Sequence, residues 1–128
     1  MSLFSIIALI LLAFIGFRYL MMFKVKLKKG KDVPELSGNY QKAVQSGEKA
    51  LFYFYSKNCG ACKAMTPVVE ELSKERKNCF LVDVQMDPVT PGALSVMATP
   101  STVIVEGGKI LDFLIGPQRK EKLETIMA

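Results

Sequence analysis

The chain contains no histidine and only three cysteines in its 128 residues. The lack of histidine excludes Ser-His-Asp triads, Cys-His proteases, His-ligated zinc enzymes and iron sites built on a histidine facial triad, since all of these need an imidazole. Three cysteines cannot form a four-cysteine zinc site or a framework of several disulfides. Any chemistry that the chain performs must therefore come from carboxylates, lysines, tyrosines or thiols.

Apolar and charged residues are unevenly distributed. Half of the residues are hydrophobic, and the net charge is +5. Residues 1–23 contain 19 of the apolar residues, whereas from Val33 onward 11 basic residues balance 11 acidic ones. The surplus positive charge comes from Arg18 and from a short lysine-rich stretch before Val33. The sequence therefore predicts an apolar segment, a basic linker and a neutral domain of ordinary size.

The apolar segment is long enough to cross a membrane. Leu3–Phe23 is apolar except for Ser5, Gly16 and Arg18, and about 20 such residues span the ~30 Å hydrocarbon core of a bilayer. A cleaved signal peptide is the alternative. It fits less well, because Met1-Ser2 carries no basic side chain, the apolar run is long, and no small-x-small cleavage site follows. We expect residues 1–23 to be an uncleaved anchor, with the lipid bilayer as partner of residues 3–23.

A basic collar follows the apolar segment and consists of five lysines, Lys24, Lys26, Lys28, Lys29 and Lys31. No basic residue precedes the segment, so the positive-inside rule places the collar and the domain on the cytoplasmic side. An extracytoplasmic or periplasmic domain is the alternative. The collar either attracts anionic lipid or only sets topology. We expect a linker at residues 24–34 and a folded domain at residues 35–128, with no nucleic-acid partner because the domain is neutral.

The remaining residues predict alternating helices and strands. Helices are expected at Glu35–Ser46, Cys59–Lys77 and Gly116–Met127, with only a turn of helix at Pro91–Met97. Strands are expected at Ala50–Tyr55, Phe80–Met86, Thr102–Val105 and Ile110–Ile115. Ala50–Tyr55 and Phe80–Met86 both have the pattern of a strand buried on both faces, and Gly107-Gly108 indicates a hairpin. Strands separated by helices imply parallel pairing, and the hairpin adds an antiparallel strand. The expected fold is α/β, with a small mixed sheet and helices on both faces.

The motif Cys59-Gly60-Ala61-Cys62 carries the chemistry. It follows a predicted strand and opens a predicted helix, whose free N–H groups and dipole stabilise a thiolate at Cys59. A thiolate attacks disulfides, and Cys62 can resolve the mixed disulfide that forms. Haem attachment would need histidine in place of Lys63, and a zinc ribbon would need a second cysteine pair. A pair of buried structural cysteines is the remaining alternative. Cys79 is expected to be a small buried residue rather than a third redox centre.

Over nearly all of Glu35–Ala128, these motifs resemble the thioredoxin family. The matching features are the strand Leu51–Tyr55, the two-cysteine motif, Lys63, Pro67, Asp87, Thr99-Pro100-Ser101, Gly107-Gly108 and Gly116. The resemblance implies a thioredoxin-like three-layer α/β/α fold with a mixed sheet of four to five strands, here preceded by one N-terminal transmembrane helix. It also implies that Pro100 is a cis-proline beside the disulfide and that the backbone of Thr99 pairs with an extended substrate segment. By the same resemblance, the substrate-binding residues are Thr99, Pro100, Gly60, Ala61 and Asn58.

The sequence departs from the family close to the motif. Asn58 replaces the family's tryptophan, and Ala61 replaces the proline of typical thioredoxins. The N–H of Ala61 is one more donor to a Cys59 thiolate, which would make the couple more oxidising. The family's buried aspartate, which helps to take the proton from the second cysteine, corresponds to Tyr53, and the partner lysine of that aspartate corresponds to Asp83.

The expected function is that of a membrane-tethered thiol–disulfide oxidoreductase that exchanges disulfides with protein substrates through Cys59 and Cys62. We expect no metal and no bound cofactor, because the redox-active group is the Cys59–Cys62 disulfide, and an upstream reductase or other electron donor is implied. A cytosolic domain would reduce its clients, whereas a translocated one could reduce or oxidise them. The alternative is a thioredoxin-fold binding or assembly module at the membrane with little turnover of its own, which the missing tryptophan, aspartate and lysine favour.

Overall fold

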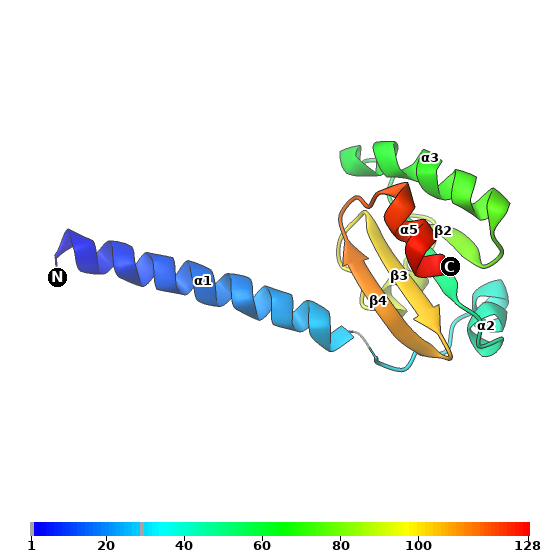
Figure 1. Ribbon diagram of the computed structural model, residues 1–128, viewed down its shortest axis with the longest axis horizontal. Coiled ribbons are helices and arrows are strands. Elements are labelled where there is room, and N and C mark those ends of the chain that lie inside the picture. The colour runs from blue at the N-terminus through cyan, green and yellow to red at the C-terminus, as the bar shows by residue number, and fades with distance from the viewer. Residues whose placement is uncertain (1, 29) are drawn as a thin grey trace.

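A long helix and a small α/β domain make up residues 2–28 and 30–128, which are the residues that the computed structural model describes. Helix α1 (Leu3–Lys28) projects from the domain as a single rod, with the N-terminus at its far end (Figure 1). Its stretch Leu3–Phe23 is long and apolar enough to cross a membrane, and it is not buried inside the protein. A signal sequence would have the same features.

Helix α1 extends beyond the apolar segment. Its backbone is helical through Lys28, so the first part of the linker predicted at residues 24–34 is helical. Lysine has good helix propensity, and Gly30, with a φ of 78°, follows the end of the helix as such glycines commonly do. Lys29 and the side chains of residues 24–28 lie outside the described residues, so the collar's effect on orientation stays a prediction.

The rest of the linker is bound to the domain. The N–H of Gly30 donates to the C=O of Ile110 at 2.7 Å, and the N–H of Ile110 donates back to the C=O of Lys31 at 2.9 Å. The N–H of Val33 donates to the C=O of Gly108 at 2.9 Å. The linker therefore adds a short paired segment to the edge of the sheet.

One mixed sheet has the strand order β2-β1-β3-β4, with β1 at Ala50–Tyr55, β2 at Cys79–Asp83, β3 at Ser101–Glu106 and β4 at Lys109–Ile115. As predicted, β1 and β2 are parallel, and the β3–β4 hairpin is antiparallel. The pairing of β1 with β3 is antiparallel, so the expectation of parallel strands was wrong there. The connection from β2 to β3 contains only the five-residue helix α4 (Val89–Ala93), about 7.5 Å long. This helix is too short to carry the chain back along a strand.

Helices cover both faces of the sheet. Helices α2 (Gly38–Gln45) and α4 lie against one face, and α3 (Gly60–Glu75) and α5 (Lys120–Met127) lie against the other. Each face has its own hydrophobic cluster, because alternate strand residues point to opposite sides. The three-layer thioredoxin-like fold with a four-stranded mixed sheet is thus confirmed.

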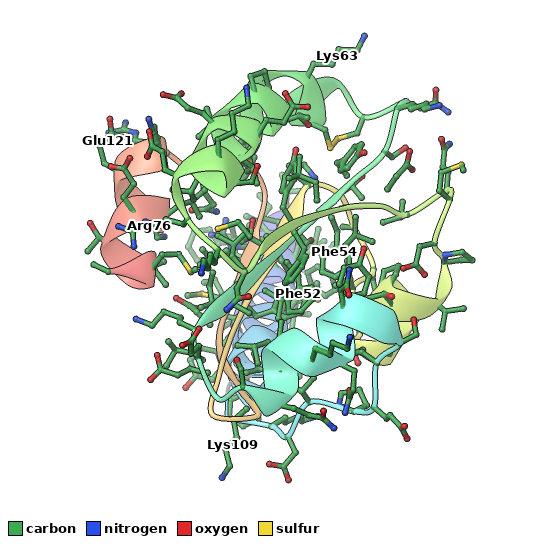
Figure 2. The ribbon with its side chains drawn as sticks, turned by 90° about the vertical axis from the view of Figure 1, so that its right-hand side faces the viewer. Phe52, Phe54, Lys63, Arg76, Lys109 and Glu121 are labelled. Carbon is green, nitrogen blue, oxygen red and sulfur yellow. A yellow bond between two sulfur atoms is a disulfide. The ribbon has the colours of Figure 1, made fainter. Side chains whose placement is uncertain are left out.

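The two neighbouring strands β1 and β2 differ in burial. Leu51 and Tyr53 point to the α3 side and Phe52 and Phe54 to the α2 side, and all four are fully buried. Figure 2 shows Phe52 and Phe54 in the interior of the domain. Strand β2 is only half-buried, because it has a neighbour on one side only. The buried-strand prediction was right for β1 and wrong for β2.

The two prolines assigned to helices behave differently. Helix α3 includes Pro67 without a break in its bounds. Pro117 does not open the last helix, because Gly116 has a φ of 88° and Arg119, the N-cap, is still extended. Helix α5 therefore begins at Lys120, four residues later than predicted.

Candidate active site

The turn between β1 and α3 holds the two-cysteine motif, and Ser56 orders it. The C=O of Ser56 accepts the N–H of Cys59 at 3.2 Å, and its hydroxyl accepts the N–H of Asn58 at 3.3 Å. Cys59 is the N-cap of α3, with an extended backbone (φ −89°, ψ 112°). An N-cap side chain faces the free N–H groups at the positive end of the helix. The Cys59 sulfur therefore lies at the N-terminus of α3, where negative charge is stabilised.

Cys59 and Cys62 form a disulfide, with their Cα atoms 5.2 Å apart. The Cys59 sulfur accepts a hydrogen bond from the N–H of Cys62 at 3.2 Å. Within the described residues, the N–H of Ala61 makes no such bond to the disulfide, and its bond to a Cys59 thiolate stays a prediction. Cys59 is half-buried, whereas Cys62 is only 2% exposed. Cys59 is therefore the sulfur that an incoming protein can reach.

The residues around the disulfide are exposed and mostly uncharged. Asn58, Gly60 and Ala61 all lie at the surface. Lys57 and Lys63 flank them and are exposed as well. Figure 2 shows Lys63 extending outward from α3, away from the body of the domain. The disulfide thus lies in a surface of small and polar residues with a lysine on either side.

Thr99 and Pro100 lie at the same end of the sheet as the disulfide. Ser101 pairs with Phe54 near the end of β1, so the residues before it run beside the chain that leads to Cys59. The peptide bond between Thr99 and Pro100 is cis, as the resemblance implied. Within residues 2–28 and 30–128, the N–H and C=O of Thr99 have no hydrogen-bond partner. The backbone of Thr99 is thus open to an added strand.

A groove of about 570 Å³ borders Thr99, and none of the described residues that line it carries a charge. Ser56 and Met97 both line the groove, and Met97 is 92% exposed. An uncharged groove beside an open backbone edge suits an extended segment with uncharged side chains.

Asp87 supports the loop that borders this groove. Its carboxylate accepts the Thr90 hydroxyl at 2.6 Å and the N–H groups of Val89 and Thr90, each at 3.1 Å. Burial works to raise the pKa of Asp87, but these hydrogen bonds outweigh it and hold the pKa below its ordinary value. The carboxylate is therefore ionised at neutral pH and caps the start of α4.

Behind the disulfide lies a buried tyrosine. Tyr53 is fully buried, its hydroxyl is hydrogen-bonded to that of Thr66 at 2.9 Å, and it donates to the C=O of Cys62 at 3.4 Å. Burial raises the pKa of Tyr53, and the hydrogen bond to Thr66 offsets this only in part. Tyr53 thus supplies a neutral hydroxyl at the position that corresponds to the family's buried aspartate.

Asp83 lies two residues beyond the position directly opposite Tyr53. The register of the parallel pair places Leu81 opposite Tyr53 and Asp83 opposite Tyr55. The Asp83 carboxylate accepts the N–H of Gln85 at 2.9 Å and stabilises the turn that ends β2. This hydrogen bond also explains why β2 stops at Asp83 and not at Met86.

Cys79 lies at the other end of the sheet from the disulfide. It pairs with Leu51 at the start of β1, whereas Cys59 follows the end of β1. Cys79 is half-buried, less than we expected, and burial raises the pKa of its thiol despite the nearby charge of Arg76. The thiol is protonated at neutral pH and hence a poor nucleophile. Among the described residues, no three His, Cys, Asp or Glu side chains are placed to hold a metal ion.

The thioredoxin family model matches residues 32–128. The chain belongs to the thioredoxin family. The thioredoxin of Alicyclobacillus acidocaldarius is 33% identical over 93 residues, which cover 70% of this chain and 89% of that protein. The thioredoxin of Listeria monocytogenes is 34% identical over 77 residues, covering 58% and 75%. The crystal structure of Fasciola hepatica thioredoxin superimposes with a TM-score of 0.58 at 28% identity, covering 68% of this chain and 86% of that one.

Family membership and the disulfide together establish the type of chemistry. The chain is a thiol–disulfide oxidoreductase with the thioredoxin fold. The similarity covers the folded domain. Helix α1 ends at Lys28 and lies outside the matched residues, since the match begins at residue 32.

Two residues of the site were not found from the sequence. Thr66, the partner of Tyr53, lies four residues after Cys62, so helical spacing alone places both on one face of α3. That spacing was the available signal. Ser56 orders the turn through its own backbone and hydroxyl, and a single serine after a strand carries no comparable signal.

Proposed function

We propose that this chain is a membrane-anchored thiol–disulfide oxidoreductase that exchanges disulfides with protein substrates through Cys59 and Cys62. The observation that carries the proposal is the Cys59–Cys62 disulfide at the N-terminus of α3, with one sulfur accessible and the other buried. Thioredoxins from two bacteria share about a third of the residues of this domain, which supports protein disulfides as the substrate class.

The proposed reaction proceeds in two exchanges. In the reduced form, the Cys59 thiolate attacks a substrate disulfide, forms a mixed disulfide with one substrate sulfur and releases the other as a thiolate. Cys62 then loses its proton and attacks the Cys59 sulfur, which forms the Cys59–Cys62 disulfide and releases the second substrate thiolate. The two electrons gained by the substrate come from the dithiol, so a separate thiol donor must reduce the enzyme for the next cycle.

The substrate is proposed to lie across Thr99 and Pro100. The backbone of Thr99, which has no hydrogen-bond partner in the described part of the chain, supports this, since an extended segment can add to it as a further strand. Exposed Asn58, Gly60 and Ala61 then contact the substrate around its cysteine. Because Asn58 offers no aromatic surface, the apolar part of the contact falls to the groove beside Met97.

Residues 3–23 are proposed to anchor the domain, with the domain on the cytoplasmic side. The exposed, apolar helix of sufficient length supports the anchor, and the five collar lysines after it support the orientation. The linker bonds between Gly30 and Ile110 support a domain held close to the membrane surface. In the cytosol the reaction runs as reduction of client disulfides.

Membrane fractionation tests the anchor. We expect the full chain to sediment with membranes, to remain there through high-salt and alkaline washes, and to be released by detergent. A variant that lacks residues 2–23 should be soluble. Recovery of a mature chain whose mass shows loss of the apolar segment would overturn the anchor in favour of a cleaved signal sequence.

A topology reporter fused after Ala128 tests the orientation. We expect the reporter to be active on the cytoplasmic side, and we expect exchange of the five collar lysines for glutamine to weaken this preference. A reporter active only outside the cytoplasm would contradict the cytoplasmic orientation. The substrates of the domain would then be extracytoplasmic proteins.

A further inference from the structure

Resolution of the mixed disulfide poses a problem of proton transfer. Cys62 must lose its proton before it can attack Cys59, yet Cys62 is only 2% exposed. A buried thiol has little direct contact with bulk water to take that proton. The structure must therefore offer a path and an acceptor close to Cys62.

An open pocket of about 300 Å³ has Cys62 in its lining. Besides Cys62, its lining includes Thr66 and Glu70 of α3 and the two lysines that flank the motif, Lys57 and Lys63. Among the residues that the structure describes, Glu70 supplies the one carboxylate of that lining. Thr66 and Glu70 follow Cys62 by four and eight residues, so helical spacing aligns all three along one face of α3.

The interior next to the pocket is unusually polar for a core. The hydroxyls of Tyr53 and Thr66 are hydrogen-bonded to each other, and Tyr53 also reaches the C=O of Cys62. Thr102 lies opposite Tyr53 on β3, and its hydroxyl is buried without a hydrogen-bond partner among the described residues. Burial is the main cause of the raised pKa of Tyr53, and the charge of Glu70 adds to it, which places that carboxylate within electrostatic reach of the hydroxyl.

We infer that Glu70 accepts the proton of Cys62 through this pocket, an inference that rests on the proposed exchange reaction. The S–H bond of Cys62 breaks, the proton passes through the solvent of the pocket to the Glu70 carboxylate, and the Cys62 thiolate attacks the Cys59 sulfur. The bond from Cys59 to the substrate sulfur breaks, and the substrate leaves as a thiolate. Glu70 then returns its proton to solvent, so atoms and charge balance without a further reactant. Lys57 and Lys63 favour the negative charge at the pocket.

The test uses the reduced full chain in detergent and the chromogenic disulfide 5,5′-dithiobis(2-nitrobenzoate). The first thionitrobenzoate is released when Cys59 attacks, at a rate proportional to reagent concentration. The second is released when Cys62 resolves the mixed disulfide, at a rate independent of that concentration. We expect Glu70→Gln to slow the second release by about 100-fold, at the low end of general base effects, and to leave the first unchanged.

Glu71→Gln is the matched control, because that carboxylate is the neighbouring one and pairs with Lys120 of α5 at 2.9 Å. It should leave both releases unchanged. Added formate should partly restore the second release in Glu70→Gln, since a small carboxylate can enter the pocket. A normal second release in Glu70→Gln, or a slow one that formate does not restore, would overturn the role of Glu70. If the first release were absent from the unmodified chain, the proposed exchange itself would fail instead.

Discussion

Replacing Cys59 by serine is expected to reduce disulfide reduction by the full chain to the uncatalysed background. Cys59 has the accessible sulfur of the pair and caps the positive end of α3, and a serine hydroxyl at that place is not ionised at neutral pH. The measurement is reduction of insulin by the full chain in detergent, with dithiothreitol as electron donor. Activity that survives in Cys59→Ser would remove the basis of the proposed mechanism.

Two further variants separate the roles of the three cysteines. Cys62→Ser should still attack substrate through Cys59 but should accumulate the mixed disulfide, because the resolving thiol is gone. Cys79→Ser should retain the activity of the unmodified chain, since Cys79 lies at the opposite end of the sheet. Mass spectrometry of the trapped adduct should place the substrate on Cys59.

Replacing Phe52 by alanine is expected to lower the free energy of unfolding by about 3–5 kcal/mol. Phe52 is fully buried and packs edge-on against Tyr40, with ring centroids 5.6 Å apart, and stacks on Phe80 at 5.2 Å. The substitution removes one of three mutually contacting rings and leaves a cavity between α2 and the sheet. Since a whole domain is stable by only about 5–15 kcal/mol, the effect is large. Urea denaturation in mild detergent, followed by tyrosine fluorescence, measures it.

Leu111→Ala is the control for this loss, because Leu111 is 46% exposed on the outer strand β4. Its effect should stay within about 0.5 kcal/mol, as for most surface substitutions. A loss of less than about 1 kcal/mol in Phe52→Ala would show that the aromatic cluster is not central to stability.

The parts of the fold that could be predicted are those with a local chemical signal. The apolar run Ala50–Tyr55 identified the central strand, because only a strand with neighbours on both sides buries every residue. Gly107 and Gly108 identified the hairpin, since both adopt the positive φ that its turn requires. The position of Cys59 at a helix start also followed directly from the chain.

The parts that could not be predicted depend on contacts between distant segments. The antiparallel entry of β3 follows from the shortness of α4, which the sequence suggested only as a turn of helix. The pairing of Gly30 with Ile110 depends on a free edge of the sheet, and no local sequence pattern predicts where that edge lies. The pocket at Cys62 likewise exists only because Thr66 and Glu70 of α3 come to lie over the end of β1.

The reduction potential of the Cys59–Cys62 couple in the full chain tests the central claim most directly. The chain is equilibrated in dithiothreitol or glutathione buffers of graded potential, free thiols are alkylated, and the two cysteines are quantified by mass. A catalytic exchange couple should titrate between about −270 and −120 mV, the range of thiol–disulfide oxidoreductases. A potential below about −300 mV, which is typical of structural disulfides, would contradict the account and would favour a binding or assembly module at the membrane.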